Sequence, residues 1–390
     1  MIMKIIKVAQ IITRMDWGGS PDIVRLLCEG LDPTIFEITL ITGRSANVSR
    51  ANRQFLDRFK ERTIHIEQLQ REINPVKDLW ALLKLYTVLK QGNFDLVQTH
   101  TAKAGILGRL AARLAGVKKI VHCSHGHNFY GYFRFWGSKL VVTIERYFDR
   151  FSDKFIALTE LEKSDLVNYR VTSASKVVVV QSGLEIEKYH CSPAEVVSLK
   201  ARWQLPAGAQ VVGMVSRLEP VKGPLSLIAA AKIVIPACPG VKFLVVGEGS
   251  LRKQMEEQCR ALGLDGSFIF TGWREDVEQL LAVLDILVLP SLNEAVGRII
   301  LEAAASGVPA IATRVGGVPE IVKDQETGLL VPPQDASSLA GALLDLLKNR
   351  EKRLRLGQAA KERITVKFSA AEMVRSISNL YLELVPNETN

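Results

Sequence analysis

Short apolar segments alternate with longer amphipathic segments along the chain. In the first half, β-branched and other apolar residues are concentrated in the segments 4–12, 37–42, 95–100, 119–124, 154–159 and 176–183. Between them lie segments with helical periodicity, among them 78–92 and 104–116, and Gly116 is a typical C-terminal cap for the second one. This alternation predicts a parallel sheet with helices on both faces.

The same pattern starts again in the second half. Its predicted strands are 209–218, 241–249, 267–273, 285–291, 309–314 and 328–333. The segment 186–208 contains Pro193 and Pro206 but no clear strand, so we place the junction between two domains there. After the last strand we expect one long helix over 338–364 and another over 369–384. Two such sheets facing each other would hold a ligand in the cleft between them, beyond the carboxyl ends of their strands.

The apolar N-terminus resembles a secretory signal peptide only superficially. Lys4 and Lys7 precede apolar residues, but the apolar part is short, ends before Asp16 and lacks a small-residue cleavage site. We therefore expect a first buried strand. A membrane-spanning helix needs about 18 apolar residues, and the apolar segment 280–292 is too short and contains Asp285. These features predict a protein that does not cross a membrane.

Composition and cysteine usage narrow the class of protein. The chain has 390 residues, of which 47% are hydrophobic and 23% charged, as is typical of globular proteins. This length favours two domains, each long enough to bury its own core. The five cysteines are scattered without a CxxC pair, which argues against a disulfide framework or a zinc site. We expect a cytoplasmic protein with no bound metal and no cofactor.

The net charge of +9 favours an anionic partner. A phosphorylated small molecule and an anionic membrane surface would both suit it. Nucleic acid would as well, but no recognisable nucleic-acid-binding module is present, so we predict none. A basic surface without a specific partner explains the same charge.

Glycines and cations follow two of the predicted strands. Gly18 and Gly19 follow the first strand and precede a helix whose N–H groups could bind an anion, although a simple strand-to-helix turn has the same pattern. No GxGxxG is present, which argues against an ordinary dinucleotide site. Arg217 and Lys222 lie on one loop of the second half, which ends at Gly223. Converging on one diphosphate, they would give charge-assisted hydrogen bonds. Two solvated cations are the alternative.

Two carboxylates accompany the apolar segment 293–307. Glu294 follows a strand, and Glu302 lies within the next predicted helix among apolar residues. Burying a carboxylate without a partner is costly, and a carboxylate can accept hydrogen bonds from two neighbouring sugar hydroxyls. The alternative is an i,i+4 ion pair between Arg298 and Glu302, in the weaker of the two orientations. The helix start beside Gly297 offers further N–H groups for phosphate.

Five segments, in order, resemble the C-terminal domain of the retaining glycosyltransferases of family 4: 216–223, 246–252, 271–277, 289–322 and 327–335. Segments 99–117 and 122–133 resemble the acceptor side of the same family, in its branch for bacterial surface polysaccharides. The resemblance covers essentially the whole chain. It implies an α/β fold of the GT-B type, with two Rossmann-like domains facing across a cleft.

The resemblance also implies a domain arrangement. We expect an N-terminal acceptor-side domain over 1–185, a linker over 186–208 and a nucleotide-sugar-binding domain over 209–365. We expect the C-terminal helix, 366–390, to pack back toward the N-terminal domain.

The resemblance implies a role for each matching position. Arg217 and Lys222 would hold the diphosphate of a nucleotide sugar, Glu294 the transferred sugar, and Glu302 the ribose hydroxyls. The remaining donor-binding positions are Gly18, Gly19, Gly247, Arg274, Ala295, Val296, Gly297 and Arg298, and His125 would contact the donor sugar near the reaction centre. The three histidines within 122–127 could also suggest a metal site, but no acid or cysteine cluster supports one.

Three positions depart from the family pattern. Ala295 replaces a usual glycine and demands a less permissive backbone, while 19–22 and 182–185 carry unusual residues. None of these departures removes a charged group from the donor site.

The implied reaction moves a hexose from a nucleotide diphosphate, UDP before GDP, to a hydroxyl of a lipid-linked sugar or glycan acceptor. Fixed cations would stabilise the leaving diphosphate without a metal. The aromatic and basic segment 128–142 would suit the cytoplasmic face of a membrane or a lipid diphosphate, or would pack on its own domain. Two alternatives remain: a nucleotide-sugar epimerase of the same architecture, and a non-catalytic nucleotide-sugar-binding module.

Overall fold

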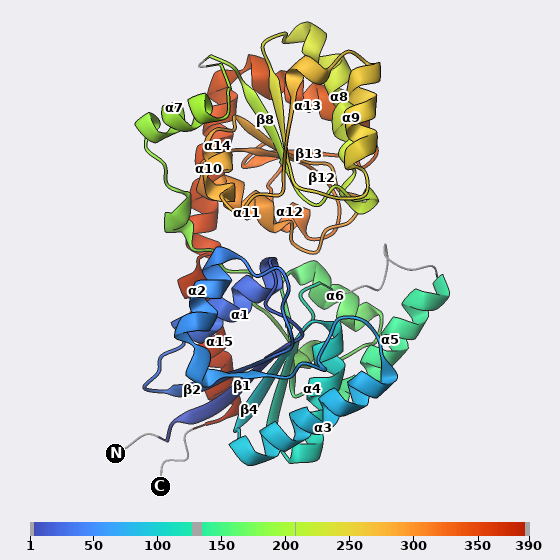
Figure 1. Cartoon of the computed structure of the whole chain (residues 1–390), viewed down its shortest axis with the longest axis vertical. Helices are drawn as coiled ribbons and strands as arrows, with labels where there is room; N and C mark the ends of the chain where they lie inside the picture. The colour runs from blue at the N-terminus through green and yellow to red at the C-terminus, as the bar shows by residue number, and fades with distance from the viewer. Residues whose placement is uncertain (1–3, 127–134, 207, 387–390) are drawn as a thin grey trace. The chain divides into compact units, whose positions relative to one another are not determined.

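The computed structural model describes residues 4–126, 135–206 and 208–386. They form two compact units, Met1–Gly183 with Ala370–Asn390, and Leu184–Ser369, which we describe separately. The chain thus leaves the first unit after Gly183 and returns to it for its last helix (Figure 1). The segment 186–208, which we expected to be a linker, lies within the second unit and contains a 3-10 turn and a helix.

The first unit contains a seven-stranded parallel sheet in the order β3-β2-β1-β4-β5-β6-β7. Its strands are β1 (Ile6–Ile12), β2 (Phe36–Thr42), β3 (Thr63–His65), β4 (Leu96–His100), β5 (Lys119–Cys123), β6 (Lys154–Ala157) and β7 (Val177–Val179). Its helices are α1 (Gly19–Gly30), α2 (Arg50–Arg58), η1 (Lys60–Arg62), α3 (Pro75–Gly92), α4 (Ala102–Ala115), α5 (Phe135–Asp149), α6 (Glu160–Asn168), η2 (Ala174–Lys176) and α15 (Ala370–Leu384). Helices α1, α2 and α15 group on one face, and α3, α4 and α5 on the other (Figure 1).

The central strands of this sheet are buried along both faces because helices cover both sides. All five residues of β4 are buried, and a core of aliphatic side chains joins β1 and β4 to α3 and α4. Helix α4 approaches the sheet closely, since a Cβ on Gly108 would lie 2.7 Å from Thr99 Cγ2. Gly116 caps α4 in the left-handed conformation, with φ of 80°, as the sequence predicted.

The second unit contains a six-stranded parallel sheet in the order β10-β9-β8-β11-β12-β13. Its strands are β8 (Val211–Val215), β9 (Lys242–Val246), β10 (Phe268–Gly272), β11 (Ile286–Leu289), β12 (Ala310–Thr313) and β13 (Gly328–Val331). Its helices are η3 (Ile186–Tyr189), α7 (Pro193–Arg202), η4 (Pro220–Lys222), α8 (Pro224–Ala237), α9 (Arg252–Ala261), η5 (Asp265–Ser267), α10 (Val277–Ala282), α11 (Arg298–Ala305), α12 (Val318–Ile321), α13 (Ala336–Lys348) and α14 (Arg350–Lys367). Helices α8, α9 and α13 group together, as do α10, α11 and α14 (Figure 1).

All the strands predicted from apolar segments are present, and both sheets are parallel as expected. Two details were wrong. Strand β3, only three residues long and partly exposed, was not predicted because it carries little apolar signal. The single helix predicted over 338–364 is two helices, α13 and α14, because Asn349 ends one and its side chain accepts a hydrogen bond from Lys352 N, 2.9 Å away, at the start of the other.

Candidate functional site

The order of strands reverses at one point in each sheet. In the first unit this point lies between β1 and β4, and in the second between β8 and β11. Ligands of open parallel sheets bind outside the carboxyl ends of the strands at such a switch point. We therefore examine the loops that follow these strands, one unit at a time.

An ion pair joins the two loops at the switch point of the second unit. Lys222 Nζ lies 2.6 Å from Glu294 Oε1, and the side chains are 19% and 9% exposed. Ser291 Oγ donates to the same carboxylate oxygen at 2.7 Å. The backbones of the two loops are also joined, because Leu292 N donates to Val221 O at 2.7 Å. The structure thus brings together two of the residues that the sequence singled out.

Glycines allow these loops to approach each other. Gly223 has φ of 61°, and a Cβ there would lie 2.1 Å from Pro290 O. Gly316 has φ of 51°, and a Cβ there would lie 1.7 Å from the backbone oxygen of Glu294. That same oxygen accepts a hydrogen bond from Gly317 N at 3.1 Å. The position of Glu294 therefore depends on backbone contacts that only glycine permits.

The chemistry of this pair suits an anionic, hydroxyl-bearing ligand. An ammonium group has three N–H donors, and its contact with Glu294 uses one of them. Both side chains are largely withdrawn from water, where charge–charge interactions are stronger than at the surface. A cation and a carboxylate fixed side by side can contact a phosphate and a sugar hydroxyl at the same time.

Glu302 has a charged partner within its own helix. Arg298 Nε lies 3.4 Å from Glu302 Oε1, and the side chains are 17% and 16% exposed. This is the i,i+4 pair that the sequence offered as the alternative to a ligand. The burial of Glu302 alone therefore does not demand an external partner, and its contact with ribose stays a prediction.

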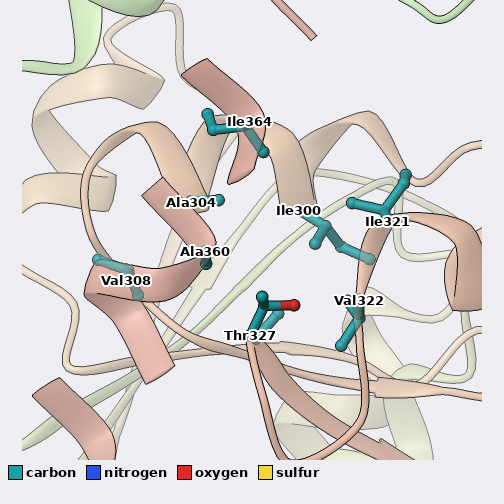
Figure 2. Close-up of a pocket in the computed structure, with 9 residues that line it drawn as sticks. Ile300, Ala304, Val308, Ile321, Val322, Thr327, Ala360 and Ile364 are labelled. Carbon is teal, nitrogen blue, oxygen red and sulfur yellow. The ribbon is translucent and has the colours of Figure 1, made fainter. Parts of the chain in front are cut away.

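The opposite face of α11 is apolar. Ile300 and Ala304, two positions from Glu302 and so about half a helical turn away, line a small pocket with side chains of α12 and α14. Figure 2 shows these apolar side chains pointing toward one another, with Thr327 beside them. This pocket has no charged lining residue, so we regard it as a packing space between α11 and α14.

Arg274, expected near the nucleotide base, has partners inside the second unit. Its guanidinium donates to both carboxylate oxygens of Asp276, at 2.8 and 2.7 Å, and lies 4.8 Å from the centre of the Trp203 ring. The hydrogen bonds from Arg274 lower the pKa of the Asp276 carboxyl. The predicted contact with a base is untested by this geometry.

The other donor-side positions differ in exposure. Arg217 is exposed, and its charge contributes to the lowered pKa of Glu219, which is due mainly to hydrogen bonds from Ser250. Gly247 has φ of 131°, and a Cβ there would lie 1.9 Å from Ser216 O, so the glycine is required by loop packing. Within the 295–298 segment, Ala295 is exposed, Val296 and Gly297 are buried, and Gly297 adopts a left-handed conformation before α11.

The switch point of the first unit contains a chain of hydrogen bonds between uncharged side chains. His125 Nε2 lies 2.8 Å from His100 Nδ1, and the two rings are stacked with centroids 5.0 Å apart. His100 Nε2 lies 2.7 Å from Gln10 Oε1. Gln10 Nε2 donates to Tyr381 Oη at 2.8 Å, and Tyr381 in turn donates to Gln98 Oε1.

Most of this chain is fully buried. Gln10, His100 and Tyr381 are 0% exposed and Gln98 is 1% exposed. Burial, helped by the nearby His125, holds the pKa of His100 well below its usual value, and burial raises the pKa of Tyr381. His100 is therefore neutral at pH 7. His125 is partly exposed and forms the outer end of the chain.

The backbone around His125 is strained. His125 has φ of 57° and Thr101, after the neighbouring strand β4, has φ of 64°. Such conformations cost a non-glycine residue about 1–3 kcal/mol and cluster at functional sites. Glu162, at the start of α6, holds the turn: it accepts from Ser124 Oγ at 2.5 Å and from Gly126 N at 3.2 Å.

Glu162 was missed by the sequence analysis. It is 5% exposed, and its other oxygen accepts from Leu158 N at 2.8 Å. The only signal was its place three residues after Thr159, the N-cap of α6, which is a common spacing at helix starts. That spacing indicates a helix start but not a contact with the turn of His125.

Gly18 and Gly19 form the connection from β1 to α1. Gly18 has φ of 151°, which is a glycine conformation, although a Cβ there would meet only Pro21 Cδ at 3.9 Å. Gly19 is the first residue of α1. The preceding loop is fixed by Asp16, whose carboxylate accepts from Ala46 N and Asn47 N at 2.7 and 2.9 Å.

Among the described residues, His122 does not join His125 in a metal site. His122 is buried and bonds to Thr99 Oγ1 at 2.9 Å, and burial lowers its pKa well below the usual value. His127 lies outside the described residues. Within 4–126, 135–206 and 208–386, no group of three or more histidine, cysteine or acidic side chains is arranged to hold a metal.

Residues 128–134 of the aromatic segment 128–142 also lie outside the described residues, so the expected contact with a membrane is untested there. Among the helices that the structure describes, none combines the length and the apolar character needed to cross a bilayer.

Comparison with known proteins gives matches over both units. The profile of "Glycosyltransferase Family 4" matches residues 17–188, and that of "Glycosyl transferases group 1" matches residues 198–363. The Escherichia coli protein named UDP-Gal:alpha-D-GlcNAc-diphosphoundecaprenol alpha-1,3-galactosyltransferase is 31% identical over 358 residues, covering 90% of each chain. The D-inositol 3-phosphate glycosyltransferase of Corynebacterium glutamicum is 34% identical over 249 residues, covering 61% of this chain and 59% of that protein.

Solved structures share the fold. Anabaena HepE, in complex with UDP and glucose, superposes with a TM-score of 0.84 at 22% identity and covers 97% of this chain and 100% of that one. The sucrose-phosphate synthase of Thermosynechococcus elongatus gives a TM-score of 0.81 at 23% identity, with 97% and 99% coverage.

Proposed function

Since the chain belongs to the glycosyltransferases of family 4 (group 1), we propose that it moves a hexose from a nucleotide-diphosphate sugar to a hydroxyl of a lipid-linked sugar or glycan acceptor. It is an enzyme of the transferase class, and its fold is the α/β GT-B fold that the resemblance implied. The proposed donor is a UDP-sugar, with a GDP-sugar as second choice, and the proposed process is the synthesis of a surface polysaccharide.

The choice of donor and acceptor is supported by the E. coli relative. Its name specifies UDP-galactose as donor and a GlcNAc-diphosphoundecaprenol as acceptor, and the match extends over 90% of both chains. A UDP-sugar donor and an acceptor attached to a lipid diphosphate are therefore the first substrates to test. Neither the transferred sugar nor the linkage follows from 31% identity.

The observation that carries the proposal is the Lys222–Glu294 pair at the switch point of the second unit. Cleavage of the sugar–phosphate bond develops negative charge on the departing diphosphate and positive character on the sugar ring. Lys222, with Arg217 and backbone N–H groups of 295–298, would stabilise the diphosphate as its charge grows. Glu294 would accept hydrogen bonds from hydroxyls of the transferred sugar.

The other assignments complete the donor site. Glu302 would use its carboxylate for the ribose hydroxyls while keeping Arg298 as its partner. Arg274 would lie near the base. The backbone could approach the diphosphate closely at Gly18, Gly19 and Gly247. His125 would contact the transferred sugar. Retention of configuration is expected from the family. A departing phosphate oxygen would take the acceptor proton, so we assign no protein nucleophile.

A thermal-shift screen tests the donor assignment, since a ligand that binds only the folded state raises the melting temperature. We expect UDP-sugars, and less strongly GDP-sugars, to raise it. The absence of any shift with both classes would refute the donor assignment. Product analysis then separates the activities: transfer requires an acceptor, an epimerase changes the sugar without one, and a binding module shows a shift but no turnover.

We further propose that the enzyme associates with an anionic membrane surface through α3. This helix lies on the surface of the first unit beside α4 (Figure 1). Five large apolar side chains are exposed on it: Val76 (67% exposed), Leu79 (57%), Trp80 (57%), Leu83 (48%) and Tyr86 (37%). Such an amphipathic, aromatic helix can lie in the headgroup region of a bilayer.

The charges of α3 match an anionic surface. The helix carries Lys77, Lys84 and Lys90, all exposed, and its acidic residue Asp78 is already paired with Lys103 at 2.5 Å. Basic residues near an anionic leaflet contribute about 1 kcal/mol each. An acceptor attached to a membrane lipid would bring the enzyme to such a surface.

Vesicle sedimentation tests this assignment. We expect the protein to sediment with phosphatidylglycerol-containing vesicles at low salt, and Leu79→Glu with Leu83→Glu to abolish sedimentation. Val366→Glu, on α14 and 73% exposed, is the matched control. If the wild type stays in the supernatant, or if the double variant sediments with the vesicles like the wild type, the membrane assignment is wrong.

A further inference from the structure

The hydrogen-bonded chain of the first unit joins segments that are far apart in the sequence. Gln10 lies on β1, His100 on β4, His125 on the turn after β5, and Tyr381 on the C-terminal helix α15. Helix α15 belongs to this unit and packs on α1. These hydrogen bonds therefore connect helix α15 with the turn that carries His125.

The donor and acceptor of each hydrogen bond can be assigned by starting from Tyr381, at the buried end of the hydrogen-bonded chain. The Tyr381 hydroxyl donates its proton to Gln98 Oε1, so its oxygen accepts the bond from Gln10 Nε2 at 2.8 Å. The amide oxygen of Gln10 then faces His100 Nε2 at 2.7 Å. A carbonyl oxygen can only accept, so the proton of the His100 ring is on Nε2.

This arrangement determines the tautomer of the next ring as well. Burial keeps His100 neutral, so it carries a single ring proton and its Nδ1 is an acceptor. His125 Nε2, 2.8 Å from that acceptor, must therefore carry a proton. In its neutral form, His125 then has its lone pair on Nδ1.

The same contacts fix the ring in space. His125 is stacked on His100 at an interplanar angle of 28°, and its backbone is held in the left-handed region by the hydrogen bonds of Glu162 to the residues on either side. The nearest buried charge on α4, Arg109, is paired with Glu145 at 2.8 Å. Both the protonation pattern and the orientation of His125 are thus set by the interior of the unit.

We propose that Tyr381, Gln10 and His100 are positioning residues that fix the tautomer and the ring orientation of His125. This inference deepens the proposed function, because it rests on His125 contacting the transferred sugar. It also gives the C-terminal helix a part in the reaction. In a histidine, the hydrogen bond made by one ring nitrogen sets which nitrogen carries the proton, and so what the other nitrogen can do.

Nitrogen NMR of the histidine side chains tests the tautomers directly. The chain contains six histidines, so their ¹⁵N signals can be assigned by single substitutions. In the wild type at neutral pH we expect both His100 and His125 to be protonated on Nε2. Tyr381→Phe should shift both toward a mixture of tautomers, whereas Tyr147→Phe, at a residue 51% exposed in the same unit, should leave them unchanged. Protonation of His125 on Nδ1, or an unchanged pattern in Tyr381→Phe, would overturn the inference.

Kinetics test the consequence for transfer. His100→Leu removes the acceptor for His125, whereas His100→Asn places an amide near the position of Nδ1. We expect His100→Leu to lower kcat by about 10–100-fold, because a small misplacement near a reaction centre slows the chemical step. The KM of the donor should change less. His100→Asn should restore most of kcat. Equal losses in both variants, in proportion to their lower melting temperatures, would mean a structural role only.

Different results would refute the proposed function and the positioning role of Tyr381, Gln10 and His100. If no nucleotide sugar binds the wild type, the proposed function is wrong. If a nucleotide sugar binds and is turned over, but the tautomers do not depend on Tyr381, the positioning inference is wrong and the proposed function stands.

Discussion

The two switch points are built from opposite kinds of polar chemistry. In the second unit, charged side chains meet in pairs that are 9–19% exposed, with Lys222 beside Glu294 and Arg298 beside Glu302. In the first unit, the inner side chains Gln10, His100 and Tyr381 are neutral and 0% exposed. The charged site suits an anionic ligand, whereas the neutral one suits the fixed orientation of a single ring.

The difference also concerns what holds each site. The second unit positions Glu294 by glycine backbones, which approach within distances that no side chain tolerates. The first unit positions His125 by a hydrogen-bonded chain and by the carboxylate of Glu162. Substitutions at the two sites should therefore differ in their effects on turnover, donor binding and stability.

Lys222→Ala should have the largest effect. It removes the cation proposed for the leaving diphosphate and leaves Glu294 with Ser291 as its remaining described partner. We expect kcat to fall by about 10²–10³-fold, as for other groups that stabilise a developing anion. Lys352→Ala, which breaks a pair with Asp345 elsewhere in the second unit, is the control. A Lys222→Ala enzyme with wild-type turnover would contradict the assignment.

Gly316→Ala should destabilise the second unit and weaken donor binding together. An alanine at φ of 51° costs about 1–2 kcal/mol, and its Cβ, 1.7 Å from Glu294 O, must displace the Glu294 backbone. We expect a melting temperature lower by about 2–8 °C and a weaker affinity for UDP. Gly240→Ala, where a Cβ meets nothing within 4 Å, should change neither.

The neutral interior of the first unit should make the protein sensitive to mild acid. Burial lowers the pKa of both His100 and His122 below 6.5. The unfolded chain therefore binds more protons below about pH 6.5, and the stability present above that pH is lost as the pH falls. Each histidine contributes up to about 1.4 kcal/mol per pH unit.

Denaturant unfolding at pH 7 and pH 5 measures this dependence. His122→Asn should reduce the difference in unfolding free energy between pH 7 and pH 5 by the contribution of one histidine. A wild type equally stable at both, or a variant with the same pH dependence, would show that these rings are not kept neutral by folding.

Asp276→Asn should have the smallest effect. Its pKa is lowered by the hydrogen bonds from Arg274, so the stabilisation is present above about pH 3.9 and is lost as the pH falls through the lowered value. The pair is partly exposed, and we expect a difference of about 0.2–1 kcal/mol at pH 7. Melting curves should therefore differ slightly at pH 7 and converge only as the pH falls well below about 3.9. A difference that grows in acid would contradict this origin.

The sequence predicted what is local and periodic. Parallel sheets, their strands and the loops after β8 and β11 follow from apolar segments bounded by glycine and proline. The charged candidates Lys222 and Glu294 could be found because each lies in a loop that follows a predicted strand. Their contact depends on the neighbouring positions of β8 and β11, which chain order alone does not give.

The rest depended on long-range assembly. Gln10, Gln98 and Tyr381 are ordinary residues of a strand or helix in the sequence, and only the fold places them in one chain of hydrogen bonds. The break at Asn349 was missed because the residues around it, 348–353, include no glycine or proline that would mark the end of a helix. Glu302, a carboxylate among apolar residues, is paired with Arg298 one helical turn away, and its contact with ribose stays a prediction.

Isothermal titration of the full chain with UDP is the most direct test of the nucleotide site. We expect the wild type to bind UDP saturably at one site. Lys222→Ala should bind UDP with an affinity lower by about tenfold or more, as for loss of a charge-assisted hydrogen bond. His100→Leu should bind UDP with an affinity within about twofold of the wild type. No binding of UDP to the wild type, or equal affinity in Lys222→Ala, would contradict the placement of the diphosphate at the switch point of the second unit.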